Sequence, residues 1–350
     1  MLVPILASSD YFKFPRKSLF SRGKAIFKYF LMHWRKVLRD NFTHWEKLAD
    51  FLELDEEFRS KILKHPSFPL NLPRRLANKI KKNCLDDPIL RQFLPLRDEL
   101  LSSPGFSLDP VEDSSFLQGN KLLKKYEGRA LLITAGVCAM NCRFCFRKNF
   151  TYKTKEKGFE KELNILVQDT SISEIILSGG DPLSLGNEAL FDLIKKLDRI
   201  DHLKLLRFHT RYPIGIPERI DNSFLRLLSE CRLQVVFILH VNHPDELDDD
   251  VLLSCKKIMK LGIPIRTHTV LLEGVNDDLT TLKNLFTLLI HHGIMPYYLN
   301  QLDRVSGTAH FEVSIDKGKK LIEELTTLLP GYAIPRYAQE IPGSKSKTAL

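Results

Sequence analysis

From about residue 129 onwards, short apolar runs alternate with longer helical stretches. The apolar runs, which are typical of β-strands, span residues 130–134, 174–178, 204–209, 233–240, 264–272 and 295–300. Stretches with helical character include residues 188–197, 222–231, 245–261, 279–291 and 316–329. Strands that alternate with helices in this way predict a parallel sheet joined by right-handed crossovers.

Six strand–helix units in series predict an α/β fold with a partial (β/α)6 barrel at residues 129–330, because a complete barrel of this kind has eight units. The preceding stretch, 41–128, is predicted as an N-terminal helical region of short pieces broken by prolines. Thr43 and Glu46 have the spacing of a capping box, which predicts that a helix begins there. A short C-terminal segment, 331–350, follows the barrel.

The composition is that of a protein with a large core, since 43% of its 350 residues are hydrophobic and 27% are charged. No apolar run approaches the roughly 18 residues that a membrane span requires. Six cysteines, three of them clustered, are typical of reduced thiols rather than of a disulfide framework. The sequence therefore predicts a cytoplasmic protein.

Positive charge is concentrated at the start of the chain. The net charge is +9, and residues 1–39 hold nine Lys or Arg against one acid, so the barrel is close to neutral. A nucleic-acid enzyme usually has a basic field over its working domain, so this distribution argues against that class. We expect residues 1–40 to form a basic N-terminal extension without a catalytic role. A partner-binding arm and a transit peptide are the alternatives for this segment.

Three cysteines lie in one short stretch directly after the first predicted barrel strand. Cys138, Cys142 and Cys145 have the spacing C-x3-C-x2-C, and no fourth cysteine lies nearby. Thiolates are the usual ligands of iron–sulfur clusters, so three of them predict a [4Fe–4S] cluster with one iron open to another ligand. The alternative is a structural zinc site in a binding module, which normally needs four ligands. The remaining cysteines are scattered singly, at Cys84, Cys231 and Cys255.

This spacing resembles the signature of radical S-adenosylmethionine (SAM) enzymes, whose barrels are also partial. A second motif, at the end of the apolar run 174–178, resembles the glycine-rich SAM-binding motif of that family. Glycines in such a motif let the backbone approach a ligand closely. The residues that the resemblance assigns to SAM here are Ser178, Gly179, Gly180 and Asp181.

Three further stretches resemble lysine 2,3-aminomutases, a family of radical SAM enzymes. They are residues 209–220, 240–244 and 297–303. Four others narrow the resemblance to the branch that makes β-lysine for the modification of elongation factor P, namely 87–95, 105–113, 125–132 and 346–348. The resemblance extends from about residue 42 to the end of the chain. It also implies that Phe144 lies against the SAM adenine and that His240 faces SAM; a core position and structural hydrogen bonding are the respective alternatives.

Enzymes of this family also use pyridoxal 5′-phosphate (PLP), which a lysine near the C-terminus holds as a Schiff base. In the Gly/Ser-rich stretch at the end of this chain, Lys347 matches that lysine best, and Lys345 is the second candidate. The resemblance places Arg129 and Arg211 around the PLP phosphate. Lys125 stands where the family has another arginine, which keeps the charge but loses the planar fork.

The resemblance also assigns the residues that bind L-lysine. Arg147 should pair bidentately with the α-carboxylate, as a planar guanidinium can. Asp303 matches one of two acids that select the ε-ammonium group, and Glu340, a longer acid, stands at the position of the other. His268 replaces a glutamine near the PLP, so its role stays open.

Together these features imply an isomerase that converts L-lysine to β-lysine of the R form through a 5′-deoxyadenosyl radical and PLP. The implied partners are elongation factor P with its lysyl-transferring ligase, and an electron donor such as flavodoxin or ferredoxin. A related aminomutase that acts on glutamate or arginine is the nearest alternative, although Asp303 and Glu340 would repel a glutamate side chain. A tRNA-modifying radical SAM enzyme is a second alternative.

Overall fold

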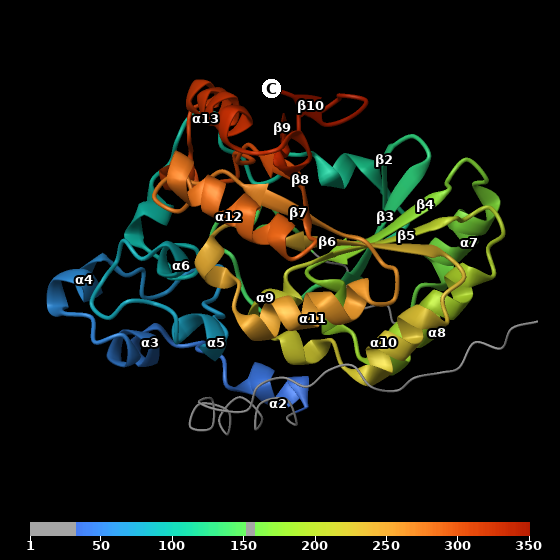
Figure 1. Ribbon diagram of the computed structural model, residues 1–350, viewed down its shortest axis with the longest axis horizontal. Coiled ribbons are helices and arrows are strands. Elements are labelled where there is room, and N and C mark those ends of the chain that lie inside the picture. The colour runs from blue at the N-terminus through green and yellow to red at the C-terminus, as the bar shows by residue number, and fades with distance from the viewer. Residues whose placement is uncertain (1–32, 152–157) are drawn as a thin grey trace, which may run out of the picture.

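A single sheet forms the centre of the molecule. The structure is a computed structural model that describes residues 33–151 and 158–350 (Figure 1). Its ten strands follow one another across the sheet in sequence order. Six consecutive parallel strands confirm the predicted α/β arrangement: β3 (Arg129–Ala135), β4 (Glu174–Gly179), β5 (Leu205–Thr210), β6 (Gln234–His240), β7 (Ile265–Val270) and β8 (Met295–Asn300).

Both edges of the sheet extend beyond the predicted barrel. On one side β1 (Leu117–Gln118) and β2 (Leu122–Tyr126) pair antiparallel with the sheet, so the prediction of helical pieces alone up to residue 128 was wrong there. On the other side β9 (Arg336–Gln339) is parallel to β8, and β10 (Thr348–Ala349) is antiparallel to β9. These added strands are short and carry polar residues, which is why the apolar pattern did not reveal them.

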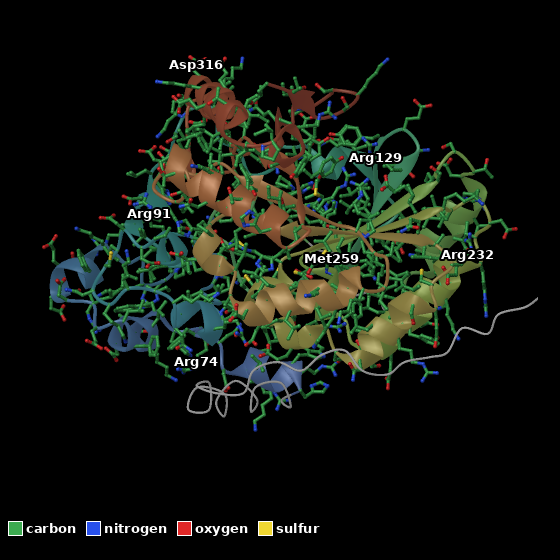
Figure 2. The ribbon with its side chains drawn as sticks, viewed as in Figure 1. Arg74, Arg91, Arg129, Arg232, Met259 and Asp316 are labelled. Carbon is green, nitrogen blue, oxygen red and sulfur yellow. The ribbon has the colours of Figure 1, made fainter. Side chains whose placement is uncertain are left out.

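Amphipathic helices cover the outer face of the sheet (Figures 1 and 2). They are α7 (Glu160–Gln168), α8 (Asn187–Asp198), α10 (Asn222–Ser229), α11 (Asp249–Met259), α12 (Leu279–His291) and α13 (Ile315–Leu328). Phe208 of β5 stacks on Phe237 of β6 at 4.8 Å between ring centroids, and Phe224 of α10 packs edge-on against both. All three rings are fully buried, and each contributes about 1.5–3 kcal/mol by leaving water.

Short helices make up the N-terminal region: α3 (Trp45–Phe51), α4 (Glu56–Lys61), α5 (Arg74–Ala77) and α6 (Pro88–Arg91). The predicted capping box is absent, because α3 begins at Trp45 with His44 as its N-cap and no side chain caps it. Water can satisfy the unpaired N–H groups of the first helical turn where the turn is exposed. Because His44 is exposed, α3 needs no side-chain cap.

Only the end of the predicted N-terminal extension lies within the described residues. There α2 (Trp34–Arg39) packs on the barrel, with the buried Trp34 ring edge-on to Tyr212 at 5.7 Å and beneath the Arg219 guanidinium at 5.0 Å. This helix is therefore part of the packed structure rather than of an extension. The rest of the basic segment lies outside the described residues. Among the helices that are described, none combines the length and apolar character needed to span a bilayer.

Candidate active site

The three clustered cysteines lie together in the loop after β3, as the sequence predicted. The loop turns tightly, since the Cys145 N–H donates to the Cys142 carbonyl at 3.0 Å. Between them, the buried Arg143 anchors the loop through its Nε, which donates to Glu99 at 2.7 Å. All three thiols are free and partly buried. Burial and the neighbouring Cys142 raise the pKa of Cys145 to about 11, so iron must displace the protons on binding.

This arrangement fits a cluster better than a single metal ion. Within residues 33–151 and 158–350, no group of three or more His, Cys, Asp or Glu side chains is placed to hold one ion. A zinc site needs its ligands to converge on one point. The thiolates of a [4Fe–4S] cluster each bind a different iron, so they stand apart. Three free thiols on one loop are therefore a donor set that fits a [4Fe–4S] cluster with one iron left open to another ligand.

The glycine motif holds the cysteine loop at the end of β4. A Cβ atom on Gly179, which has φ +114°, would lie 2.6 Å from the Ala135 carbonyl oxygen. A Cβ atom on Gly180 would lie 2.3 Å from the Val137 carbonyl oxygen. The glycine backbone thus closely approaches the backbone at the end of β3 and the start of the cysteine loop. There the Gly180 N–H donates to the Ala135 carbonyl at 2.7 Å. Ser178 is buried beside it.

Asp181, which the sequence assigned to SAM, has protein partners on both carboxylate oxygens. It accepts hydrogen bonds from the Thr210 hydroxyl at 2.8 Å, from the Arg211 N–H at 2.8 Å and from the Leu183 N–H at 3.0 Å. Burial raises its pKa to about 6, which these hydrogen bonds partly offset. Its side chain ties the end of β4 to the end of β5.

Phe144 and His240, which the resemblance assigned to SAM, lie side by side in the structure. Their ring centroids are 5.6 Å apart, and the Arg211 guanidinium is 5.5 Å from the Phe144 centroid. Phe144 also packs in a small apolar cluster with Phe311, so it has a core role as well. The His240 Nε2 is buried without a partner, and burial lowers the pKa of this imidazole to about 3.

A second group of predicted residues meets around Lys347. Its Nζ donates to the Asn300 amide oxygen at 2.7 Å and lies 3.9 Å from a Glu340 carboxylate oxygen. The Tyr298 ring centroid is 5.4 Å away. Lys345, by contrast, is exposed. The structure thus places Lys347 beside Glu340, one of the two acids that the resemblance assigned to the substrate, and leaves Lys345 at the surface.

The two edges of the open sheet meet at Glu340. Its carboxylate accepts a hydrogen bond from the Tyr126 hydroxyl of β2 and pairs with Lys125 Nζ at 3.0 Å. These contacts lower the pKa of Glu340 against the effect of burial. Asp303 is half-buried as well, and desolvation raises its pKa to about 6 although Lys347 acts in the opposite direction. The predicted ammonium site therefore holds one ionised acid and one that titrates near neutrality.

Arg147 has a partner that the sequence did not identify. Its Nε donates to the carboxylate of Asp113 at 2.7 Å, and both side chains are less than a tenth exposed. Asp113 begins a 3-10 turn, Asp113–Phe116, just before β1. Asp113 ends the stretch 105–113, which resembles the family, but the sequence alone assigns it no role. The charge of Asp113 also raises the pKa of Asp303, so Asp113 lies within electrostatic range of that acid.

Two further imidazoles lie inside the barrel. His209 of β5 and His268 of β7 meet edge to face at 5.0 Å, and the Nε2 of each is buried without a partner. Burial lowers the pKa of both well below the usual value, and the charge of Lys347 adds to this effect. Buried polar atoms are rarely left unpaired. Neutral imidazoles with unused hydrogen-bonding capacity therefore fit a polar ligand such as PLP in the interior next to Lys347.

The three basic residues predicted for the PLP phosphate do not share partners. Lys125 contacts Glu340, and the Arg129 guanidinium lies 4.8 Å from the Tyr126 ring centroid (Arg129 is labelled in Figure 2). Arg211 instead donates from Nη1 to the sulfur of Cys142 at 2.8 Å. Arg211 therefore contacts the cysteine loop, whereas Lys125 and Arg129 lie near Glu340 and Tyr126.

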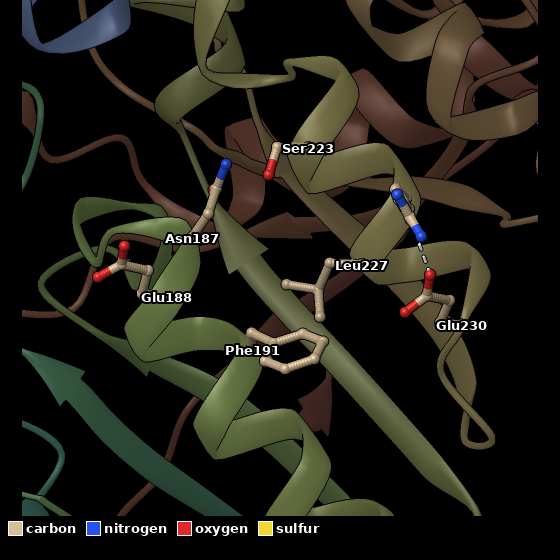
Figure 3. A pocket seen from close by; sticks show the side chains of 7 residues that line it. Asn187, Glu188, Phe191, Ser223, Leu227 and Glu230 are labelled. Carbon is tan, nitrogen blue, oxygen red and sulfur yellow. Dashed lines mark hydrogen bonds and ion pairs between the residues drawn. The ribbon is translucent and has the colours of Figure 1, made fainter.

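A surface hollow lies away from all of these residues. It opens between α8 and α10, and Figure 3 shows the side chains that line it. The lining side chains are those of Asn187, Glu188, Phe191, Ser223, Arg226, Leu227 and Glu230. None of them was assigned a role from the sequence, and the hollow lacks the buried titratable groups that mark the barrel interior.

A three-thiol loop at the end of the first parallel strand of a partial barrel defines a radical SAM enzyme. Residues 127–233 match a family model described as a 4Fe-4S single cluster domain. Among solved structures, a radical SAM methyltransferase from Sphaerobacter thermophilus covers 62% of this chain and 68% of its own, at 17% identity and a TM-score of 0.46.

Curated relatives identify the family within this class. The L-lysine 2,3-aminomutase of Escherichia coli (strain K12) is 40% identical over 325 residues, which cover 91% of this chain and 94% of that protein. The L-lysine 2,3-aminomutase of Haemophilus influenzae (strain ATCC 51907 / DSM 11121 / KW20 / Rd) is 38% identical, over 90% of this chain and 95% of its own. The chain belongs to the lysine 2,3-aminomutase family of radical SAM isomerases. The predicted cofactors, a [4Fe–4S] cluster, SAM and PLP, agree with this membership.

Proposed function

We propose that the protein converts L-lysine to β-lysine of the R form. The observation that carries this proposal is the group around Lys347, whose side-chain amine lies beside Asn300 and Glu340 and within electrostatic range of the half-buried Asp303. A PLP lysine next to two acids suits a substrate with an ammonium group at the far end of its side chain. A zinc-binding module or a tRNA-modifying enzyme has no need of this arrangement.

Each residue has a distinct task in this proposal. Cys138, Cys142 and Cys145 hold three irons, and Lys347 holds PLP. When bound, the cluster and SAM supply a hydrogen-abstracting radical, and PLP supplies the group that carries the amino nitrogen from C2 to C3. In this proposal His209 and His268 hydrogen-bond the ligand joined to Lys347, and the support is that their buried Nε2 atoms have no other partner.

The substrate is held at its two charged ends. Arg147, oriented by Asp113, binds the α-carboxylate in a charge-assisted contact. Asp303 and Glu340 accept the ε-ammonium group, and two acids in this place would repel the side chain of glutamate. Lys125 offsets one of the two negative charges, which moderates the attraction for the ammonium group.

The direct test is a reaction with all components. Protein reconstituted anaerobically with iron, sulfide and PLP is mixed with SAM, dithionite and L-lysine, and the products are analysed by mass spectrometry and chiral chromatography. β-Lysine of the R form with SAM largely recovered is the expected result. Parallel reactions with L-glutamate and L-arginine should give no β-amino acid. If SAM is cleaved but lysine is unchanged, the substrate assignment is wrong although the cluster chemistry stands.

We also propose that the β-lysine serves elongation factor P, for which the resemblance over residues 87–95 and 346–348 is the support. Adding elongation factor P, its lysyl-transferring ligase and ATP to the reaction should give a factor whose mass increases by one β-lysyl group. Flavodoxin or ferredoxin should replace dithionite as the electron donor. The link is wrong if the ligase transfers the product of this enzyme no better than it transfers L-lysine.

Acidic pH should weaken the enzyme's action on lysine. The Asp303 carboxyl has a pKa of about 6, so protons remove the charge that attracts the ε-ammonium group as the pH falls below that value. The kcat/KM for lysine, which reports the free enzyme, should then drop about tenfold per pH unit. An Asp303→Asn variant should have a low kcat/KM without this acidic limb. A parent profile that stays flat through pH 6 would contradict the role of Asp303, provided that the visible absorbance shows an intact cluster.

A further inference from the structure

Arg211 stands out because it is a buried cation that contacts a predicted cluster ligand. It follows β5 directly and is 6% exposed. Its Nη1 donates to the Cys142 sulfur at 2.8 Å. The other end of the guanidinium, Nη2, donates to Glu246 at 2.9 Å and to Gln92 at 2.7 Å. The planar fork thus bridges a thiol on one side and a carboxylate on the other.

The carboxylate is itself held rigidly, so the position of Arg211 is fixed. One Glu246 oxygen accepts hydrogen bonds from the Asn242 and His243 N–H groups, at 3.2 and 3.0 Å, and from the Gln92 amide at 3.0 Å. Glu246 is completely buried. Breaking a buried pair of this kind is costly, because it leaves an uncompensated charge. Arg211 therefore cannot leave Cys142 without losing its other partners.

We propose that Arg211 tunes the redox potential of the cluster, an inference that rests on the [4Fe–4S] cluster of the proposed function. When Cys142 ligates iron, the Nη1–H group donates a charge-assisted hydrogen bond to the thiolate sulfur. The cluster becomes more negative when it gains one electron from the external reductant, so the nearby cation stabilises the reduced form and raises the potential. Hydrogen bonds to the sulfurs and local charge are among the factors that set cluster potentials.

This role differs from the one that the sequence suggested. A phosphate contact would require the guanidinium to face PLP, whereas four hydrogen-bonding directions of Arg211 lead to Cys142, Glu246, Gln92 and, through its backbone N–H, Asp181. The two roles predict different measurements. A tuning residue changes the midpoint potential and leaves PLP affinity unaltered, and a phosphate ligand does the reverse.

The test is a redox titration of the reconstituted protein without substrate, followed by electron paramagnetic resonance of the reduced cluster. Arg211→Gln should lower the midpoint potential by at least about 59 mV, which is a tenfold change in a one-electron equilibrium. PLP affinity, measured by absorbance titration, should stay the same. Arg75→Gln is the control, since it removes another largely buried guanidinium that pairs with Glu218 at 2.8 Å and does not contact the cysteines. Its potential should equal that of the parent.

A second variant covers the case in which Arg211→Gln fails to fold. Glu246→Gln keeps the shape of the side chain and removes the negative charge that offsets Arg211, so the midpoint potential should rise. An unchanged potential in the variant that folds overturns the proposal, and weaker PLP binding with an unchanged potential restores the phosphate role. Because no lysine is present, these outcomes are independent of whether the enzyme forms β-lysine.

Discussion

Replacing Lys347 by alanine is expected to abolish β-lysine formation, with kcat falling on the order of 10³-fold or more because the covalent attachment of PLP is lost. The amine lies beside Asn300 and Glu340, and the substitution removes it without touching either partner. The absorbance band of bound PLP should weaken in the same variant. SAM binding and the cluster spectrum should be unchanged, since the cysteine loop is anchored by Arg143 and Glu99 and not by Lys347.

Lys345→Ala is the matched control for this prediction. Lys345 is two residues away in the same segment and has the same side chain, but it is exposed. Its removal should leave both kcat and PLP absorbance close to the parent values. The opposite pattern, with activity lost in Lys345→Ala and retained in Lys347→Ala, would show that the wrong lysine was assigned and that the end of the chain rearranges when PLP binds.

The parallel core of this fold could be predicted from sequence because burial on both faces makes its strands apolar. The short strands at the edges could not, since β2 and β9 carry Lys, Arg and Gln and are fixed by pairing with a distant neighbour. The prediction of a capping box at Thr43 was wrong although the spacing matches the motif, because the helix starts one residue further on.

Residues of the site were predictable where a short motif carries the chemistry. The cysteines were predicted from their spacing and the glycines from their resemblance to the SAM-binding motif, and in the structure the glycines pack against the cysteine loop. Asp113 and Glu246 were not predictable, because each acts by holding an arginine from a distant part of the chain. The resemblance assigned Arg211 to the PLP phosphate. Its hydrogen bond to the Cys142 sulfur, which only the fold reveals, indicates a role at the cluster instead.

Loss of a cluster ligand should have the second large effect. In Cys142→Ala, two thiolates remain for a cluster that needs three, so reconstituted protein should bind little iron and acid-labile sulfide and lose its visible cluster absorbance. Without the cluster no electron reaches SAM, and neither 5′-deoxyadenosine nor β-lysine should form above background. Removing Cys142 also frees Arg211 from its sulfur partner while leaving Glu246 in place, so the fold should survive.

Cys84→Ala provides the comparison, since Cys84 lies in the N-terminal region outside the cysteine loop and is partly exposed. Iron, sulfide and product should match the parent. Circular dichroism and PLP absorbance separate a lost cluster from a lost fold, because PLP depends on Lys347 and not on the thiols. A Cys142→Ala protein that keeps four irons and cleaves SAM would require a ligand set other than the three cysteines. Full PLP binding without iron is the expected result, and it would show that the two cofactors occupy separable parts of one barrel.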